Sequence, residues 1–493
     1  MGGVAFLMVN HSTLEQHKFK KGKFITPFND ALGDKLQLSS WGSERLPEYL
    51  WIGLILKKHG RSKGLQMCRW ILERLHDSLP NVNLPTISNI FTLKDISQQL
   101  FWEFVEHIAG QESLSPLTLI YTYRSFPIFN KIFQTSLDYK EQINSIEAVL
   151  KDAYYHQTEF ATDIRFVVLY FELMQERTHI SKDTFDEICK YPLLEHSDEQ
   201  MHLIRPLIRS MEIARGNILD SETDKSNLTL FWKMVSEMSD CELYTINYEA
   251  LAKNPEVYLN YLHEIFEYLD QITSTLEPLN TRNIVLCGIA TYAYKRISEL
   301  IEHQLYNEIS GRSIIRNIIE DYIIMKYLLK HEKEKPTIWD EYQYYGIGLY
   351  KLVMERERSN PCSFKDGHVN YALLQCLVNE YRDEEFIDID TSYFDKQNIR
   401  LKAKDVGEEE LYGLFYDYDS SFEHGLWGAI RESSLLKCDN PAHQFHLVLD
   451  SDNEQKLPSV WKDCVRTMNK ILMLLNNELS IPTQLLSEVK KFE

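Results

Sequence analysis

Apolar residues recur every three or four positions through most of the chain, which is the spacing of one face of an α-helix. The alternation typical of half-buried strands is weak, and short runs such as 445–449 fit either small strands or extended loops. The pattern predicts an all-α protein without internal repeats. Helices are expected at 44–58, 62–77, 92–109, 138–155, 157–176, 198–216, 226–239, 254–276, 280–306, 311–331, 338–358, 368–381, 407–434 and 456–479.

The chain of 493 residues is too long for a single hydrophobic core. Periodicity weakens around 240–253, before an Asn-Pro pair that favours a new helix start. We therefore predict a multi-helix N-terminal domain at 1–245 and a helical bundle at 250–480. The acidic, irregular stretch 382–406 is expected to be an inserted loop of this bundle, and Gly311 is expected to form a turn between two long helices.

Charge is unevenly distributed along the chain. The net charge is −20, yet residues 1–76 hold twelve Lys and Arg against six acids. An acidic body does not attract nucleic acid over long range, although a basic N-terminal region could contact phosphate. Lys57, Lys58, Arg61 and Lys63 gather where a helical hairpin is expected to turn at 59–60. They either bind phosphate or an acidic partner, or form a solvated helix end.

Candidate cofactor chemistry is sparse. The eight cysteines form no C-x-x-C pair and show no zinc-finger spacing with histidine, so buried free thiols in a reducing cytosol are expected. Asp388, Asp390 and Asp395 lack the glycine and the closing glutamate of a calcium loop. Motifs for nucleotide hydrolysis, nicotinamide binding, serine hydrolysis and zinc proteolysis are absent. We expect no cofactor and no bound metal.

The N-terminus has no basic region before its short apolar run, and no apolar stretch approaches the length of a membrane span. The expectation is a cytoplasmic protein without a membrane partner.

Two polar stripes about 100 residues apart are the strongest candidate site. Each stripe has i, i+4, i+8 spacing, so its members share one helix face. The stripes are Arg312, Arg316 and Glu320 in one helix, and Tyr416, Ser420 and His424 in the other. The first helix is otherwise apolar all round, which is typical of the centre of a bundle. Buried charges must be paired, so the stripes form either a structural clasp or an active site.

Both interpretations make chemical sense. Arg316 and Glu320 are close enough on one helix to pair with each other, which would give a self-contained buried ion pair. His424 beside Ser420 and an arginine of another helix could act as a general acid–base group. It could equally be a core histidine tied to Tyr416, Ser420 or Glu320 by hydrogen bonds.

An Arg316-x3-Glu320 helix followed by a Tyr416-x3-Ser420-x3-His424 helix resembles an uncharacterised bacterial helical family over residues 250–480. That family is remotely similar to the HEPN superfamily. Many HEPN proteins are metal-independent ribonucleases of toxin–antitoxin and antiphage systems, and others are non-catalytic binding domains. The resemblance implies a HEPN-like C-terminal bundle with a candidate polar centre at Arg316, Glu320, Ser420 and His424, and, by analogy with HEPN proteins, a dimer.

In the catalytic version, His424 is the acid or base, and Arg316 with Arg312 stabilises the transition state. Glu320 orients Arg316, while Ser420 and Tyr416 position His424 or the phosphate. The chain departs from the HEPN nuclease pattern, in which a histidine follows the arginine by four to six residues on one helix. Such spacing occurs at Arg296 and His303 and at Arg69 and His76, as often as chance provides.

The leading hypothesis from sequence is therefore a bacterial defence or toxin-type effector, a metal-independent ribonuclease with RNA as its partner. The alternative is a non-catalytic helical interaction, scaffold or sensor subunit of an antiphage defence complex, with other defence proteins as partners. A pocket for a nucleotide or another small ligand within the bundle is a third hypothesis.

Overall fold

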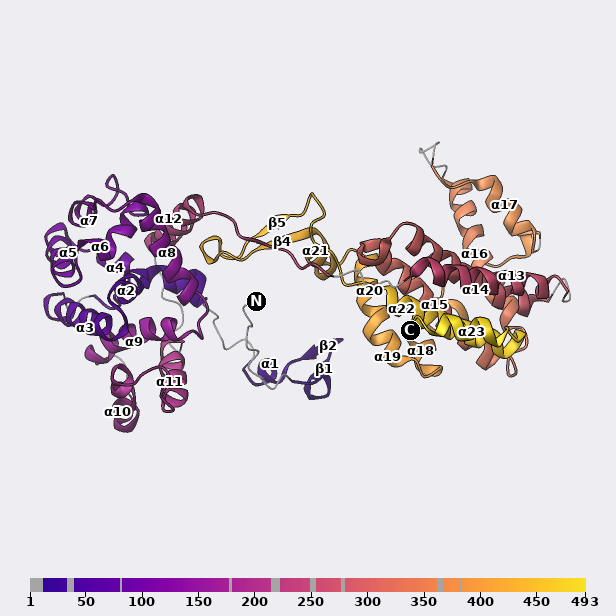
Figure 1. The fold of residues 1–493 in the computed structure, drawn as a ribbon, viewed down its shortest axis with the longest axis horizontal. Helices are drawn as coiled ribbons and strands as arrows, with labels where there is room; N and C mark the ends of the chain where they lie inside the picture. The colour runs from indigo at the N-terminus through magenta and orange to yellow at the C-terminus, as the bar shows by residue number, and fades with distance from the viewer. Residues whose placement is uncertain are drawn as a thin grey trace. The chain divides into compact units, whose positions relative to one another are not determined.

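The computed structural model describes residues 12–32, 40–79, 82–176, 180–213, 222–248, 254–275, 280–360, 367–381 and 383–493 (Figure 1). It is mostly helical, as predicted. The chain forms two compact units, one of residues 1–243 with 437–446 and the other of 244–436 with 447–493. The segment 437–446 thus belongs to the N-terminal unit, although sequence order assigns it to the C-terminal bundle.

The N-terminal unit is built around α2, whose residues are buried from Leu46 to Leu56. Trp51 and Trp102 are among its largest fully buried side chains. Its helices are α1 (Pro27–Leu32), α2 (Leu46–His59), α3 (Arg61–Ser78), α4 (Ile87–Phe91), α5 (Asp95–Ala109), α6 (Gln111–Leu114), α7 (Pro127–Phe133), α8 (Tyr139–Ala153), α9 (Glu159–Met174), α10 (Lys182–Lys190), α11 (Met201–Ile213) and α12 (Glu222–Met238). The strands β1 (Lys18–Lys20) and β2 (Lys23–Ile25) form an antiparallel pair.

The predicted hairpin of α2 and α3 is confirmed, and it turns at Gly60, whose φ of 76° suits a residue without Cβ. The basic residues at this turn already have carboxylate partners. Lys57 pairs with Asp152, Lys58 with Glu112 at 2.5 Å, and Arg61 with Asp163 at 2.9 Å. Intramolecular pairing therefore accounts for three of the four cations without phosphate.

The C-terminal unit is organised around α15, which packs against α14, α18, α20 and α22. Its isoleucines Ile314, Ile315, Ile318, Ile319 and Ile323 are all at most 1% exposed, which confirms a central helix. The helices are α13 (Pro255–Thr273), α14 (Thr281–Glu302), α15 (Ile309–His331), α16 (Ile338–Ser359), α17 (Tyr371–Asn379), α18 (Ile399–Asp405), α19 (Glu409–Leu411), α20 (Asp417–Glu423), α21 (Trp427–Ser434), α22 (Trp461–Leu479) and α23 (Thr483–Lys490).

Two helix predictions for this unit need correction. Gly311 is not a turn but lies inside α15, and a Cβ there would come within 2.2 Å of the Leu305 carbonyl oxygen. Close backbone approach, not chain reversal, explains this glycine. The helix predicted at 407–434 is broken into α19, the π-helical turn Tyr412–Tyr416, α20 and α21. Gly425 ends α20 with a φ of 56°.

This break is a Schellman motif. The amide of Leu426 donates to the Ser421 carbonyl at 2.9 Å, and the amide of Gly425 donates to the Phe422 carbonyl at 3.2 Å. His424 is the last residue before the glycine and caps the helix. The motif therefore ends α20 next to His424, the last residue of the second stripe.

The stretch 382–406 is not simply a loop, because α18 forms within its described part. Lys402 anchors α18, and its buried ammonium lies 4.1 Å from the centre of the Tyr327 ring. Asp395 accepts a hydrogen bond from Tyr327 and pairs with Lys335 at 3.0 Å. The three aspartates of this stretch are thus not gathered as metal ligands in the described residues.

A short sheet of order β3-β4-β5 contains β3 (Leu243–Tyr244), β4 (Leu435–Cys438) and β5 (Leu447–Leu449). The run at 445–449 therefore includes a strand. Across the described residues, no helix combines the length and apolar character needed to cross a membrane.

Candidate functional site

Helices α15 and α20 lie against each other in antiparallel fashion, and the two stripes face one another along this contact. Glu320 meets Tyr416 near one end of the contact, and Arg316 meets Ser420 one turn further along. Ser313 donates a hydrogen bond to Glu423 near the other end. Two helices from distant parts of the sequence therefore bring the predicted polar residues together.

Five side chains form a continuous hydrogen-bonded group that we call the Arg316 clasp: Arg316, Glu320, Tyr393, Tyr416 and Ser420. Arg316 donates from Nε to Ser420 Oγ at 3.0 Å and from Nη2 to the Tyr416 hydroxyl at 2.6 Å. The hydroxyls of Tyr416 and Tyr393 donate to the two oxygens of Glu320 at 2.9 and 2.7 Å. The guanidinium also lies over the Tyr416 ring, 4.6 Å from its centre.

The clasp is largely enclosed. The Arg316 and Glu320 side chains are 17% and 26% exposed, and an Arg316 nitrogen lies 3.6 Å from a Glu320 oxygen. Burial, followed by the negative charge of Glu320, raises the pKa of Tyr393 and of Tyr416 well above the ordinary tyrosine value. Both phenols therefore stay protonated and act as hydrogen-bond donors to Glu320.

Arg312 belongs to a different group. It is 6% exposed, donates to the Pro458 carbonyl at 2.5 Å, and lies 5.6 Å from the centres of both the Tyr418 and the Phe422 ring. Its nearest carboxylate contact is loose, with 3.9 Å between a guanidinium nitrogen and Asp419 Oδ1. Arg312 therefore acts in packing, and within the described residues it makes no hydrogen bond or ion pair with a member of the clasp.

Burial raises the pKa of Asp419 to about 7, helped by the negative charges of Asp463 and Glu432 and opposed by Arg312. The folded state therefore holds this proton more tightly than the unfolded chain, whose aspartate pKa is about 3.9. The stabilisation is complete below pH 4 and is lost as the pH rises towards 7.

Replacing Asp419 with asparagine, which mimics the neutral acid, should remove this loss. We expect the thermal midpoint of Asp419→Asn to match that of the wild type near pH 4 and to exceed it increasingly up to pH 7, with a constant difference above. Melting curves from pH 4 to 8 measure it. Asp417→Asn, an exposed neighbour on the same helix, is the control and should follow the wild type. A difference that does not depend on pH would contradict the assignment.

His424, the predicted acid or base, is exposed at the end of α20. Its side chain makes no hydrogen bond or ion pair with any residue in the described ranges. It lies one helical turn beyond Ser420 and does not join the clasp. Of the six predicted residues, the structure gathers Arg316, Glu320, Tyr416 and Ser420, and it leaves Arg312 and His424 outside.

A cavity of about 240 Å³ opens beside Glu320 and is lined by Asp321, Tyr342, Tyr345 and Tyr393 among others. We call it the tyrosine cleft. Tyr345 also lines two neighbouring cavities of about 520 and 650 Å³, so the three hollows share a wall. Neither Tyr393 nor Asp321 is among the site residues predicted from the sequence.

Asp321 is the least satisfied group of the cleft. Its Oδ2 is buried and accepts no hydrogen bond from any described residue. Burial, then the neighbouring Glu320, raises the pKa of Asp321 well above its ordinary value, and Arg296 opposes the rise. A buried acceptor without a donor costs free energy that a suitable ligand would recover.

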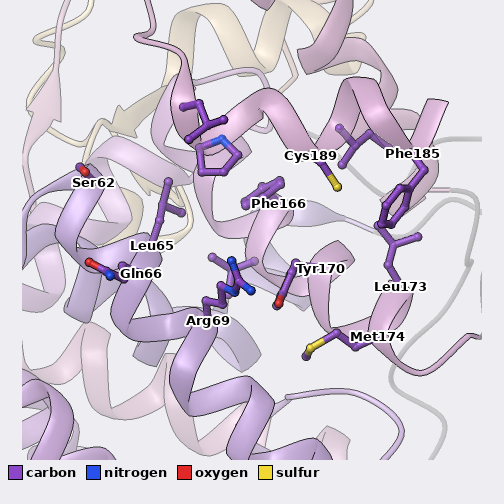
Figure 2. Close-up of a pocket in the computed structure, with 14 residues that line it drawn as sticks. Ser62, Leu65, Gln66, Arg69, Phe166, Tyr170, Leu173, Met174, Phe185 and Cys189 are labelled. Atoms are coloured by element: carbon purple, nitrogen blue, oxygen red, sulfur yellow. The ribbon is translucent and has the colours of Figure 1, made fainter. Parts of the chain in front are cut away.

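The N-terminal unit has a separate cavity of about 570 Å³ between α3, α9 and α10 (Figure 2). Its lining is mostly apolar, with Phe166, Leu173, Met174 and Phe185. Arg69 stands at this lining and is engaged by Glu73 at 2.7 Å. The Tyr170 hydroxyl also donates to Glu73, at 2.8 Å. Glu73 therefore engages both Arg69 and Tyr170 at this lining.

The cysteine prediction needs correction. Cys68, Cys438 and Cys464 are buried as expected, but Cys189, Cys241 and Cys376 are exposed. Cys362 lies outside the described residues. Within those residues, one group has the composition of a metal site: Cys241, Cys438, His443 and His446. The spacing Cys438-x4-His443-x2-His446 was visible in the sequence, but the fourth member lies far away along the chain.

Comparison with known proteins gives one result. No curated protein and no solved structure matches the chain. The model of a family of unknown function, DUF5677, matches residues 284–443. This stretch contains the whole Arg316 clasp together with Arg312 and His424, so the candidate site lies in a region similar to DUF5677.

Proposed function

We propose that the C-terminal unit is a non-catalytic binding module that takes a small organic cation in the tyrosine cleft. The observation that carries the proposal is Asp321, which lines the cavity beside Glu320 and has a buried Oδ2 that accepts no hydrogen bond from any described residue. An amine or guanidinium would supply both the missing hydrogen bond and the compensating charge. Tyr342 and Tyr345 line the same cavity, and aromatic rings there would add cation–π contacts to the bound cation.

The state of the clasp supports binding over catalysis. Every polar side chain in it has a partner from the protein itself, and Arg316 is held by Ser420 and Tyr416. An arginine that is to stabilise a phosphate must be able to turn its donors towards it. In this proposal the clasp fixes one wall of the cleft through Glu320. The same proposal includes the remote resemblance to HEPN proteins and a role in an antiphage defence complex. In that complex, this chain would be a sensor subunit.

The expected result is saturable thermal stabilisation by an organic cation such as spermidine, putrescine or agmatine. Asp321→Asn, which keeps the shape and removes the charge, should weaken this binding at least tenfold. Asp270→Asn, an exposed change in the same unit, should leave it unaltered. Isothermal titration of the three proteins measures the affinities. Equal binding by Asp321→Asn and wild type would exclude the cleft.

The pH dependence of this binding follows from the raised pKa of Asp321. A cation favours the ionised carboxylate, so binding must displace the proton that the empty site holds. Affinity should therefore rise with pH, with proton release detectable by titration in buffers of different ionisation enthalpy. Neutral analogues and nucleotides are the comparison ligands. Neutral analogues lack the positive charge, and an acidic cleft repels the phosphates of nucleotides.

The metal-independent ribonuclease is the second candidate, and one observation favours it. His424 is open to solvent one turn from Ser420, on the helix that carries half of the clasp. A flexible RNA strand could reach it there. Fragmentation of cellular RNA on expression, lost in a folded His424→Ala variant, would support this candidate and would count against a purely binding role.

A further inference from the structure

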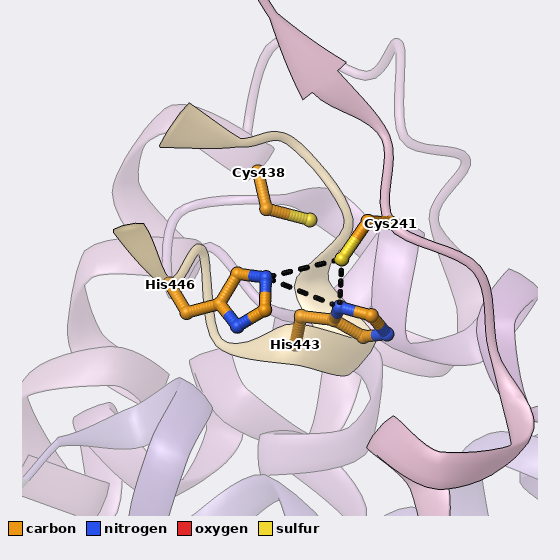
Figure 3. A group of neighbouring side chains, drawn as sticks. All are labelled: Cys241, Cys438, His443 and His446. Carbon is orange, nitrogen blue, oxygen red and sulfur yellow. Dashed lines mark hydrogen bonds between the residues drawn. The ribbon is translucent and has the colours of Figure 1, made fainter. Parts of the chain in front are cut away.

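Four side chains of the N-terminal unit converge on a point that nothing in the proposed function uses (Figure 3). Cys241, Cys438, His443 and His446 each offer one ligand atom, and these atoms all lie within 4.8 Å of one another. Cys241 Sγ is 3.1 Å from His443 Nδ1 and 3.2 Å from His446 Nε2. The two imidazole nitrogens are 3.4 Å apart.

These separations suit a tetrahedral metal. With Zn–N of about 2.0 Å and Zn–S of about 2.3 Å, a tetrahedron separates two nitrogens by about 3.3 Å and a sulfur from a nitrogen by about 3.5 Å. Two thiolates and two imidazoles form a ligand set that favours zinc over the harder cations. Four protein ligands leave no open position, which is typical of a structural site.

The surroundings orient the ligands before any metal binds. His443 Nε2 lies 3.1 Å from the Ser239 carbonyl oxygen, so its proton is held there and Nδ1 is free for a metal. Asn440 donates to the Asp240 carbonyl at 2.9 Å, and the Asp439 amide donates to the Glu242 carbonyl at 2.7 Å. These hydrogen bonds join residues 239–242 to residues 439–443, so the two segments that carry the four ligands are held together.

We propose that Cys241, Cys438, His443 and His446 bind one structural Zn²⁺, which fixes the 437–446 segment to the rest of the N-terminal unit. This segment is separated by almost 200 residues of chain from Cys241, and such a long loop is costly to close without a cross-link. Apolar contacts assist it, because Phe445 packs against Tyr154 and Tyr155 at ring distances of 4.8 and 5.5 Å. The zinc adds coordination bonds that link Cys241 to the 437–446 segment, which these apolar contacts do not provide.

The first test is the metal content of the full chain, purified without chelators and with any affinity tag removed. Elemental analysis should give one zinc per chain. Cys241→Ser should lose most of it, while Cys189→Ser, a change of another exposed thiol in the same unit, should keep it. Replacing the zinc with Co²⁺ should give the visible absorption of a tetrahedral thiolate–imidazole site. Equal metal content in the two variants would overturn the proposal.

A second measurement does not depend on how well the variants fold. Alkylation of the wild-type protein, followed by mass spectrometry, should modify Cys241 only after a chelator is added. Cys376, exposed on α17, should react with and without the chelator. Rapid modification of Cys241 before chelation, in protein first incubated with excess Zn²⁺, would overturn the site. A disulfide between Cys241 and Cys438 would do so as well.

Discussion

Arg316→Ala should lower the free energy of unfolding of the C-terminal unit by about 2–3 kcal/mol, whereas His424→Ala should change it by no more than about 0.5 kcal/mol. The alanine removes the hydrogen bonds to Ser420 and Tyr416 and leaves Glu320 without its positive neighbour. Loss of a fully buried partner costs about 3–5 kcal/mol, and the partial exposure of this pair reduces that figure. His424 has no side-chain partner among the described residues to lose.

Urea denaturation of both variants and the wild type measures this difference, and Arg316→Lys refines it. A lysine keeps the charge but cannot donate to Ser420 and Tyr416 in the fork geometry of a guanidinium, so an intermediate loss is expected. Equal stability of Arg316→Ala and wild type would show that the clasp is not structural. The same proteins, expressed in cells with total RNA monitored, separate the two candidate functions.

The pairing of the two stripes could be anticipated from spacing, because i, i+4 periodicity puts residues on one face whatever the fold. The sequence could not reveal Tyr393, the fifth member of the clasp. It lies in the irregular stretch 382–406, where no periodicity assigns a direction to a side chain. Spacing alone also could not show that Arg316 joins the clasp and Arg312 does not. The difference depends on which neighbouring element packs against each turn of α15.

The errors in the predicted helix boundaries arose because a glycine can either end a helix or allow close packing within one. Gly311 resembles a stop signal but permits close approach to the Leu305 carbonyl within α15. Gly425, inside a predicted helix, is the residue that ends α20 through its positive φ. The four metal-site candidates escaped for a different reason. Cys241 and the 438–446 segment meet only because 437–446 folds into the N-terminal unit, and sequence order gives no sign of this.

The largest loss of stability is expected for Glu212→Ala, at about 3–5 kcal/mol. Glu212 lies between Arg45 and Arg165 in the N-terminal unit, and the three side chains are at most 3% exposed. One carboxylate therefore serves two buried guanidiniums. Burial lowers the pKa of Arg165, and the charge of Arg45 lowers it further, whereas Glu212 raises it. Without Glu212, two buried positive charges would lie close together without a carboxylate partner.

Trp41, one of the eight tryptophans of the chain, belongs to this site, because both guanidiniums lie over its ring at 4.8 and 5.6 Å from the centre. Urea denaturation followed by tryptophan fluorescence measures the loss. Glu187→Ala is the matched control, since its 2.6 Å pair with Lys190 is exposed and should be worth less than about 1 kcal/mol. Glu212→Gln retains the hydrogen-bonding shape and should fall between the two. If Glu212→Ala lost no more than Glu187→Ala, the arginines would have to be balanced by another group, and the triad would not hold the turn that precedes α2 to α9 and α11.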